Sequence, residues 1–229
     1  MLFRQLFDQA TWTYTYLLAD EASGEAVIID AVDTQLERDI KLINELGLTL
    51  VYAFDTHVHA DHITSIGDLR EHFGCTTGIS RHGQVACADL QLSEDDNFSF
   101  GQHHISVMET PGHTDGCLSF VSDNRVFCGD ALLIRGCGRT DFQQGDAGTL
   151  FDSITKKLFT LPDDTLLYPG HDYKGMTCST IMEEKLWNPR LKLGRDDFIM
   201  FMKNLDLANP KRIHEAVPAN LACGKSKTP

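Results

Sequence analysis

The sequence predicts an α+β fold in which mixed β-sheets are covered by helices. Short strand patterns fill the N-terminal residues, helix and strand patterns alternate after them, and the C-terminal residues are mostly helical in pattern. With 229 residues and a hydrophobic content of 42%, the chain is long enough to build its own core. We therefore expect one domain over residues 1–229, with a short, mainly helical C-terminal extension from about residue 180.

The N-terminal part predicts the element order β-β-β-α-β-α. Ser23-Gly24 predicts the hairpin turn between the second and third strands, and Thr34-Gln35-Leu36-Glu37 is a capping-box pattern that predicts a helix start. Gly47 and Gly74 are typical of positions that follow the last residue of a helix. The strands are expected over residues 2–7, 13–18, 26–29 and 48–54, and the helices over the segments that begin near residues 36 and 66.

The rest of the chain predicts further strands and a second group of helices. A helix is expected over residues 149–159, because Phe151, Ile154 and Leu158 share one face. Asn188-Pro189 and Asn209-Pro210 predict helix breaks, and the tail Gly224–Pro229 is expected to be frayed. The strands are expected over residues 75–79, 105–109, 117–121, 126–128 and 166–168.

The charge balance argues against polyanionic partners. The chain has 20 Lys and Arg against 33 Asp and Glu, a net charge of -13, and no long basic run. Nucleic acids and anionic membrane surfaces are therefore poor candidate partners. An anionic small substrate would need a local cationic pocket built from particular arginines.

The seven cysteines are odd in number, scattered, and form no C-x-x-C pair, so they are expected to be reduced thiols. Those at positions 75, 117, 128 and 178 lie in or beside apolar segments, where a free cysteine commonly packs as a small apolar side chain. The N-terminal segment lacks the features of a signal peptide, and no apolar run approaches the length of about 20 residues that spans a membrane. These features favour a bacterial cytoplasmic location, with a processed organellar form as the alternative.

A cluster of three histidines and an aspartate follows the expected strand over residues 48–54. His57, His59, Asp61 and His62 lie within one short loop, so their nitrogen and oxygen atoms are near one another. Imidazole nitrogens together with a carboxylate are the ligands of d-block metal ions. The loop therefore predicts a metal site, although a single histidine cluster also occurs in ordinary solvated loops.

Three later strands end in the same way, with a glycine just before a polar donor. The donors are His113 after Pro111-Gly112, Asp130 after Gly129, and His171 after Pro169-Gly170. A glycine allows the tight turn and the close backbone approach that an ion site requires. Each motif alone would fit a surface histidine or an ordinary turn. Their repetition at successive strand ends favours a shared metal site.

These residues resemble the signature of the metallo-β-lactamase superfamily. Its H-x-H-x-D-H motif stands at His57, His59, Asp61 and His62, and the remaining metal positions match His113, Asp130 and His171. The resemblance implies an αβ/βα sandwich of two mixed β-sheets flanked by helices, with the metal site at one edge.

A closer resemblance is to the persulfide dioxygenases. It rests on residues 133–143, on Tyr168–Tyr173, on Asn188–Leu191 and on Ala216–Asn220. The resemblance implies one Fe(2+) per chain, bound by His57, His113 and Asp130. Such a facial triad leaves positions for O2 and a substrate sulfur. The implied reaction converts glutathione persulfide, O2 and water to sulfite and glutathione, in sulfide detoxification, and the family is expected to form homodimers.

The same resemblance implies roles for the surrounding residues. His59, Asp61, His62 and His171 are expected to act as catalytic neighbours that orient the ligands and handle protons. Arg139, Tyr173 and Arg190 are expected to bind the carboxylates of glutathione. Arginines in such positions are also often engaged in surface or helix-end salt bridges. Thiols near a persulfide could exchange sulfur, but packing is an equally good role for those at positions 137 and 223.

Two alternatives remain open at the level of sequence. A glyoxalase II-type hydrolase of S-acylglutathione thioesters would use the same residue types to bind two metal ions. The segment that follows His171 is short for the helical substrate domain of that family. A metal-binding interaction protein without catalysis is the second alternative, and it does not explain why every expected donor position is filled.

Overall fold

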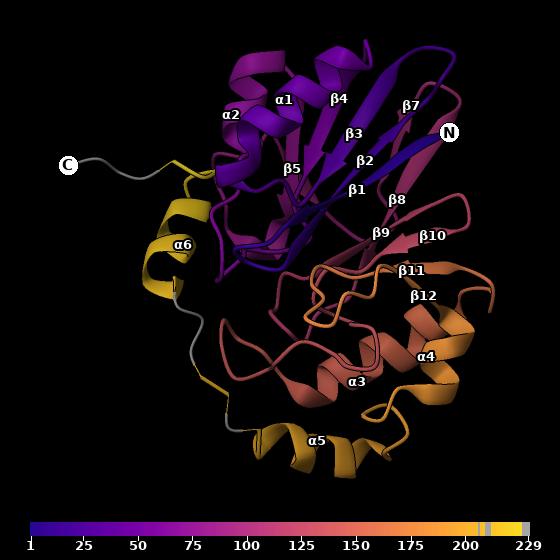
Figure 1. Ribbon diagram of the computed structural model, residues 1–229. Coiled ribbons are helices and arrows are strands. Elements are labelled where there is room, and N and C mark those ends of the chain that lie inside the picture. Colours follow the sequence, from indigo (N-terminus) through magenta and orange to yellow (C-terminus); the bar gives the residue numbers. More distant parts are fainter. Residues whose placement is uncertain (206, 209–211, 226–229) are drawn as a thin grey trace. The chain divides into compact units, whose positions relative to one another are not determined.

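The computed structural model describes residues 1–205, 207–208 and 212–225, which form two compact units (Figure 1). Unit 1 contains residues 1–92, 97–105 and 212–225. Unit 2 contains residues 93–96, 106–205 and 207–208. The break expected at Asn209-Pro210 and most of the expected frayed tail lie outside the described residues.

Unit 1 is built on a six-stranded sheet with the strand order β1-β2-β3-β4-β5-β6. The first three strands are antiparallel, and β3 to β6 are parallel. The hairpin expected between β2 and β3 is confirmed. The elements that lie wholly in unit 1 are β1 (Leu2–Asp8), β2 (Thr13–Ala19), β3 (Glu25–Ile29), α1 (Leu36–Glu45), β4 (Thr49–Phe54), α2 (Ile66–Phe73), β5 (Thr76–Ser80), β6 (Leu90–Leu92), β7 (Asn97–Phe100) and α6 (Ile213–Asn220). Of these, β7 belongs to the second sheet.

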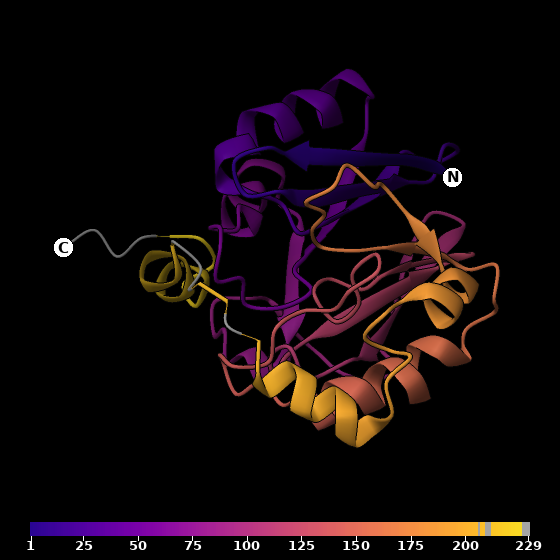
Figure 2. The ribbon, with the colours of Figure 1, turned by 60° about the horizontal axis from the view of Figure 1, so that its bottom comes forward.

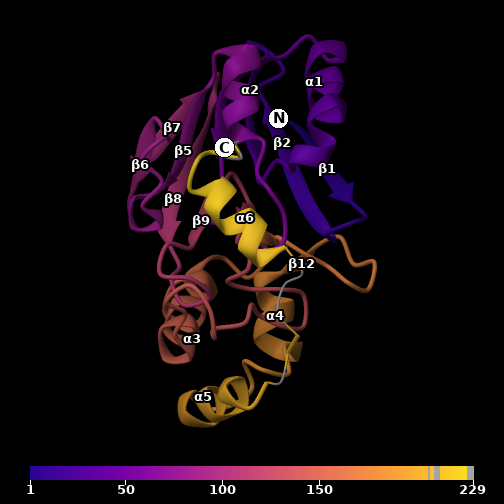
Figure 3. The ribbon, with the colours of Figure 1, turned by 90° about the vertical axis from the view of Figure 1, so that its left-hand side faces the viewer.

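The helices α1 and α2 cross over between parallel strands and lie side by side (Figure 3). Ile43 of α1 and Leu69 of α2 are fully buried with Leu17, Ile28 and other sheet residues in one apolar cluster. Burying these side chains stabilises the sheet by roughly 2 kcal/mol each. Gly74 ends α2 in a left-handed conformation, as expected from the sequence.

Unit 2 contains most of the second six-stranded sheet, whose strand order is β12-β11-β10-β9-β8-β7. Strand β8 (His103–Glu109) begins in unit 1 and ends in unit 2. The other elements of unit 2 are β9 (Leu118–Ser122), β10 (Arg125–Phe127), α3 (Ala147–Lys156), β11 (Leu166–Tyr168), β12 (Ser179–Thr180), α4 (Ile181–Trp187) and α5 (Arg195–Lys203).

Helices α3 and α5 lie side by side over the core of unit 2 (Figure 2). Leu150 and Ile154 of α3 are buried in one cluster with Phe198 of α5 and with Val126 and Leu167 of the sheet. The α+β fold with two mixed six-stranded sheets and flanking helices is therefore confirmed. No helix in the described part of the chain combines the length and the apolar character that crossing a membrane requires.

Several local predictions were wrong. The capping box at Thr34 does not form, because residues 33–35 make a short 3-10 turn and the residue preceding α1 is Gln35, which makes no side-chain cap. The expected helix over 149–159 begins earlier, at Ala147, with Asp146 as its cap, and it ends at Lys156 before a 3-10 turn. The short strands β6, β7 and β12 were not predicted, because two to four residues carry too little periodicity.

The expectation that all the cysteines are reduced was also wrong. Cys87 and Cys223 of unit 1 form a disulfide, although they are 136 residues apart in the sequence. Cys75, Cys117 and Cys128 are buried as expected, whereas Cys178 is exposed. Burial raises the pKa of Cys75 to about 11 and that of Cys117 to about 12, so these two thiols are unreactive at neutral pH.

Candidate metal centre

The donors of unit 1 lie where two parallel strands end. Strands β3 and β4 are parallel neighbours, so their carboxyl ends share one edge of the sheet. Asp30 directly follows β3, and Asp55 directly follows β4. The backbone N–H of Asp30 donates to the carbonyl of Phe54 at 2.9 Å, which joins the two strand ends. Residues 56–62, which we call the histidine loop, therefore begin beside a buried aspartate.

Asp30 holds the start of the histidine loop with both of its carboxylate oxygens. Oδ1 accepts from the backbone N–H of Thr56 at 2.7 Å, and Oδ2 accepts from the hydroxyl of Thr56 at 2.9 Å. Oδ1 also lies 3.1 Å from Nε2 of His59. Asp30 is buried and has a positive φ of 54°, which turns the chain sharply at this point.

The contacts of Thr56 determine the tautomer of His57. The Thr56 hydroxyl donates its one hydrogen bond to Asp30, so its oxygen accepts a hydrogen bond from Nδ1–H of His57 at 3.0 Å. Neutral His57 then carries its lone pair on Nε2, which is the form that binds a metal ion. The side chain is only 2% exposed. The chain Asp30–Thr56–His57 is therefore suited to orienting a ligand histidine.

The other donors of the loop form a buried polar cluster. The ring of His59 lies 4.2 Å from the rings of both His57 and His62, measured between centroids. Nδ1 of His62 lies 3.1 Å from the Asp61 carboxylate and 3.4 Å from the hydroxyl of Thr13. Donor atoms of His59, Asp61 and His62 all lie within 4.8 Å of one another, as metal binding requires.

Burial and charge act together on the protonation of this cluster. Burial lowers the pKa of His59, but the charge and hydrogen bond of Asp30, with Asp55 and Asp61 nearby, raise it to about 9. Burial raises the pKa of Asp55 to about 7, against the opposing effects of His59, and the Thr64 hydroxyl donates to its carboxylate at 3.0 Å. Nδ1 of His59 is a buried atom without a hydrogen-bond partner among the described residues. This nitrogen can therefore hydrogen-bond to a substrate or a water molecule.

The donors of unit 2 also follow strand ends at one edge of a sheet. Strands β10 and β11 are parallel, and β8 runs in the same direction because each of the two pairings β8–β9 and β9–β10 is antiparallel. The backbone N–H of Gly170 donates to the carbonyl of Gly129 at 2.8 Å. This contact joins the loops that carry Asp130 and His171.

Asp130 lies between the two histidines of unit 2. Its Oδ2 is 3.6 Å from Nε2 of His113, and its Oδ1 is 3.6 Å from Nε2 of His171. These distances exceed a hydrogen bond, but ligand atoms about 2.1 Å from one ion are separated by up to about 4.2 Å. Oδ1 is a buried atom that lacks a hydrogen-bond partner among the described residues. A metal ion would satisfy this oxygen.

The backbone fixes the tautomer of His113. Nδ1 lies 2.6 Å from the carbonyl oxygen of Arg139, which only accepts, so Nδ1 carries the proton and Nε2 carries the lone pair. Gly138 makes this approach possible. A Cβ there would lie 2.3 Å from the carbonyl oxygen of Asp130 and 2.9 Å from Nδ1 of His113. A Cβ on Gly170 would lie 2.8 Å from Oδ1 of Asp130.

The three residues expected to bind substrate all lie in unit 2, and their side chains differ in what they contact. The guanidinium of Arg139 forms a bidentate ion pair with Asp141, at 2.6 and 2.7 Å, and covers the Phe142 ring. Arg190 donates through Nη1 to the carbonyl of Cys137 at 2.8 Å. Tyr173 is 61% exposed, and its ring stacks on His171 with centroids 6.1 Å apart. Their role in binding stays a prediction.

Sequence reasoning missed the residues that support the donors. Asp30 follows a strand in the same way as the donors that were found, so its position was a usable signal. The carbonyl of Arg139 and the side chain of Asn220, which contacts the histidine loop, gave no such signal. The former acts through its backbone, and the latter lies more than 150 residues from the loop.

The donors present fit a metal ion. His57 and His113 each present an unprotonated Nε2 when neutral, and Asp130 supplies a carboxylate oxygen. Two imidazoles and one carboxylate form the set that holds non-haem iron(II), and zinc or manganese accept the same atoms. The chain thus carries a His/Asp metal-binding site of the kind found in its fold family.

Comparisons with known proteins agree with this reading. The family described as the metallo-beta-lactamase superfamily matches residues 13–171. The mitochondrial persulfide dioxygenase ETHE1 of Mus musculus is 52% identical over 232 residues, covering 100% of this chain and 91% of that protein. The crystal structure of ETHE1 from Myxococcus xanthus matches with a TM-score of 0.96 and 55% identity, covering 98% of this chain and 100% of that one.

The hydrolases are more distant relatives. The hydroxyacylglutathione hydrolase of Rhizobium meliloti is 36% identical, covering 73% of this chain and 65% of that protein. The glyoxalase II-type alternative is therefore the weaker one, and an enzyme of the dioxygenase type is supported over a non-catalytic protein. The resemblance stated from the sequence is confirmed: the chain belongs to the persulfide dioxygenases of the metallo-beta-lactamase superfamily.

Proposed function

We propose that this enzyme is an iron(II)-dependent dioxygenase that oxidises glutathione persulfide with O2 and water to sulfite and glutathione. The observation that carries the proposal is the whole-chain identity to persulfide dioxygenases, together with donor histidines whose tautomers suit metal binding. His57, His113 and Asp130 are the proposed ligands. Bound iron(II) supplies the redox chemistry that O2 needs.

The remaining donors are proposed to act as bases and hydrogen-bonding groups. His59 is anchored by Asp30 through Nε2, so its buried Nδ1 is directed by a fixed ring. His62 is oriented by Asp61, and His171 lies beside Asp130. We assign these four residues, His59, Asp61, His62 and His171, to holding substrate and water and to moving protons.

Glutathione binding is assigned to Arg139, Tyr173 and Arg190. Among the described residues, the side-chain hydrogen bonds of Arg190 all run through Nη1, which leaves other N–H groups for a carboxylate. The guanidinium of Arg139 is already paired with Asp141. Arg190 is therefore the stronger of the two cationic candidates.

The reaction is tested with protein purified without air. We expect about one iron per chain and O2 uptake that depends on glutathione persulfide, with sulfite formed in proportion. The matched assay offers S-lactoylglutathione to the same protein. Two metal ions per chain and hydrolysis of that thioester without O2 uptake would instead assign the hydrolase function.

A homodimer is proposed from family membership and from an exposed apolar face. Met182, Leu186 and Trp187 of α4 are 47%, 47% and 54% exposed. Apolar side chains gathered in this way often mark an interface. Sedimentation equilibrium of the wild type and of Trp187→Glu checks the proposal: a dimer is expected for the first, and a shift toward monomer for the second.

A bacterial cytoplasmic location is proposed, with a processed organellar form as the alternative. Five cysteines are free among the described residues, which suits a reducing compartment, whereas the Cys87–Cys223 disulfide is unusual there. Thiol trapping in intact cells would report the state of this pair. Localisation of a tagged chain by fractionation would decide the compartment.

A further inference from the structure

Among the described residues, Asn220, at the end of α6, makes its side-chain hydrogen bonds with the histidine loop and with Thr64 just after it. Its Nδ2 donates to the carbonyl oxygens of His59 and His62, each at 2.9 Å. Its Oδ1 accepts from the backbone N–H of Thr64, also at 2.9 Å. Asn220 is only 2% exposed. One buried amide therefore contacts the backbone at two points in the loop and at one point just after it.

The chemistry of these contacts requires an asparagine. Two carbonyls need N–H donors and one N–H needs an acceptor, which also sets the orientation of the amide. An aspartate in this position would keep the acceptor but place a carboxylate against two carbonyls. A glutamine would be one methylene too long for a fully packed site. An alanine would leave three buried polar groups without partners.

The rest of α6 holds Asn220 against the loop. Ala216 and Ala219 are buried with Ile63, which follows the loop, and Val217 packs in the cluster that contains Val58 of the loop. Close backbone contact extends beyond the helix: a Cβ on Gly224 would lie 1.9 Å from the carbonyl oxygen of Thr64.

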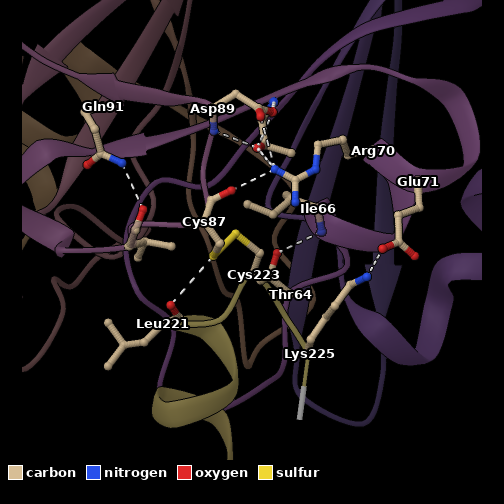
Figure 4. Close-up of a disulfide and its surroundings, with 12 residues drawn as sticks. Thr64, Ile66, Arg70, Glu71, Cys87, Asp89, Gln91, Leu221, Cys223 and Lys225 are labelled. Carbon is tan, nitrogen blue, oxygen red and sulfur yellow. Dashed lines mark hydrogen bonds and ion pairs between the residues drawn. A yellow bond between two sulfur atoms is a disulfide. The ribbon is translucent and has the colours of Figure 1, made fainter. Parts of the chain in front are cut away.

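A disulfide tethers the same segment. Cys223 lies three residues beyond Asn220 and is bonded to Cys87, which lies between β5 and β6 (Figure 4). Cys223 is buried in the cluster with Val58. Two side contacts lie nearby: Arg70 donates to the carbonyl of Cys87, and Lys225 pairs with Glu71 of α2. The C-terminal segment is thus tied to unit 1 on both sides of the disulfide.

We propose that Asn220 is a positioning residue for the histidine loop, and that the Cys87–Cys223 disulfide keeps Asn220 in place. The carbonyls of His59 and His62 flank the peptide planes of Ala60 and Asp61, so their hydrogen bonds set the course of the loop. Ligand atoms must be held to within about 0.5 Å for tight metal binding. The proposal rests on the metal-binding part of the proposed function, and not on the identity of the reaction.

The test compares metal affinity in Asn220→Ala and wild type, using cobalt(II) in competition with a chelator on the metal-free protein. Loss of a group that supports ligands typically weakens metal binding by about 10–100-fold. We expect a rise of that size in the dissociation constant and an altered cobalt absorption spectrum. With iron saturating, kcat should fall while KM for glutathione persulfide stays close to wild type, because α6 makes none of the assigned substrate contacts.

Two further variants keep the proposal testable. Asn220→Asp retains the acceptor for Thr64, so it serves if the alanine variant does not fold, and we expect the same weakening of cobalt binding. Asn204→Ala is the matched control, because Asn204 ends α5 in unit 2 and its Nδ2 contacts only the carbonyl of Met200 among the described residues. It should bind cobalt like wild type.

Cys87→Ser tests the disulfide separately, because it breaks the tether but leaves the Asn220 side chain itself unchanged. We expect cobalt to dissociate at least threefold faster and amide hydrogens of the loop to exchange faster. A folded Asn220→Ala or Asn220→Asp protein with a cobalt dissociation constant within twofold of wild type would overturn the role of Asn220. Unchanged dissociation in Cys87→Ser would overturn the role of the disulfide. Both results are independent of whether persulfide is the substrate.

Discussion

The two units hold their donors in different ways. In unit 1, the donors stand close together in the sequence, and side chains from distant segments hold them: Asp30 at the start of the loop and Asn220 at its end. In unit 2, the donors come from three separate loops, and backbone groups hold them: the carbonyl of Arg139 and the glycines beside Asp130. The comparison implies that unit 1 is sensitive to loss of polar side chains, whereas unit 2 is sensitive to gain of atoms at glycines.

The largest effect is expected at Asp130, which lies between His113 and His171 in unit 2. In Asp130→Ala, persulfide-dependent O2 uptake should fall by at least about 10³-fold, because the carboxylate of the proposed facial triad is lost. Circular dichroism should show an intact fold, since the side chain makes no structural hydrogen bond through Oδ1 in the described part of the chain. Full activity in a folded variant would refute the ligand assignment.

The side-chain dependence of unit 1 is tested by Asp30→Asn. The substitution removes a buried charge that faces His59 and replaces one acceptor of the Thr56 hydrogen bonds. Breaking a buried charged pair typically costs about 3–5 kcal/mol, so we expect a loss of that order in the free energy of unfolding. Urea denaturation measures it. A loss below 1 kcal/mol would show that this network contributes little to the loop.

The backbone dependence of unit 2 is tested by Gly138→Ala. The added Cβ would clash with the carbonyl of Asp130, and overpacking of this kind costs about 1–3 kcal/mol. We expect that loss together with weaker iron binding. Gly194→Ala is the matched control, because a Cβ there meets nothing within 4 Å. Equal behaviour of the two variants would contradict the requirement for close approach.

The smallest effect is expected on stability at Asp146, which lies outside the donor residues of both units. Asp146 caps α3 by accepting from the backbone N–H of Thr149, so Asp146→Ala should cost about 1 kcal/mol without changing iron affinity. Thermal unfolding at a series of pH values measures the cost. Asp164→Ala, at an exposed turn of unit 2, is the control and should change stability little.

The pH dependence of that cap has a definite sign. The hydrogen bond from Thr149 lowers the pKa of Asp146 below its ordinary value. The stabilisation is therefore fully present above about pH 4 and is lost as the pH falls through the lowered value. The stability difference between wild type and Asp146→Ala should shrink in acid, and a difference that grows there would contradict the assignment.

The fold and the loops that carry the candidate donors could be predicted from the sequence because both leave local patterns. Alternation defined the long strands, and a histidine or aspartate after a strand and a glycine marked the donor loops. The disulfide, the short strands and the contacts of Asn220 left no pattern of this kind. Cys87 and Cys223 are 136 residues apart, so their pairing depends on how α6 packs in unit 1. Long-range packing, rather than local propensity, decides these features.

The proposed function makes His57, His113 and Asp130 the ligands of a single iron. Anaerobic titration of the metal-free protein with iron(II), in wild type, His57→Ala and Asp130→Ala, tests it most directly. We expect about one tightly bound iron in wild type and none in either variant. Two irons in wild type, with one retained in each variant, would contradict it, because His57 and Asp130 would then belong to different metal sites.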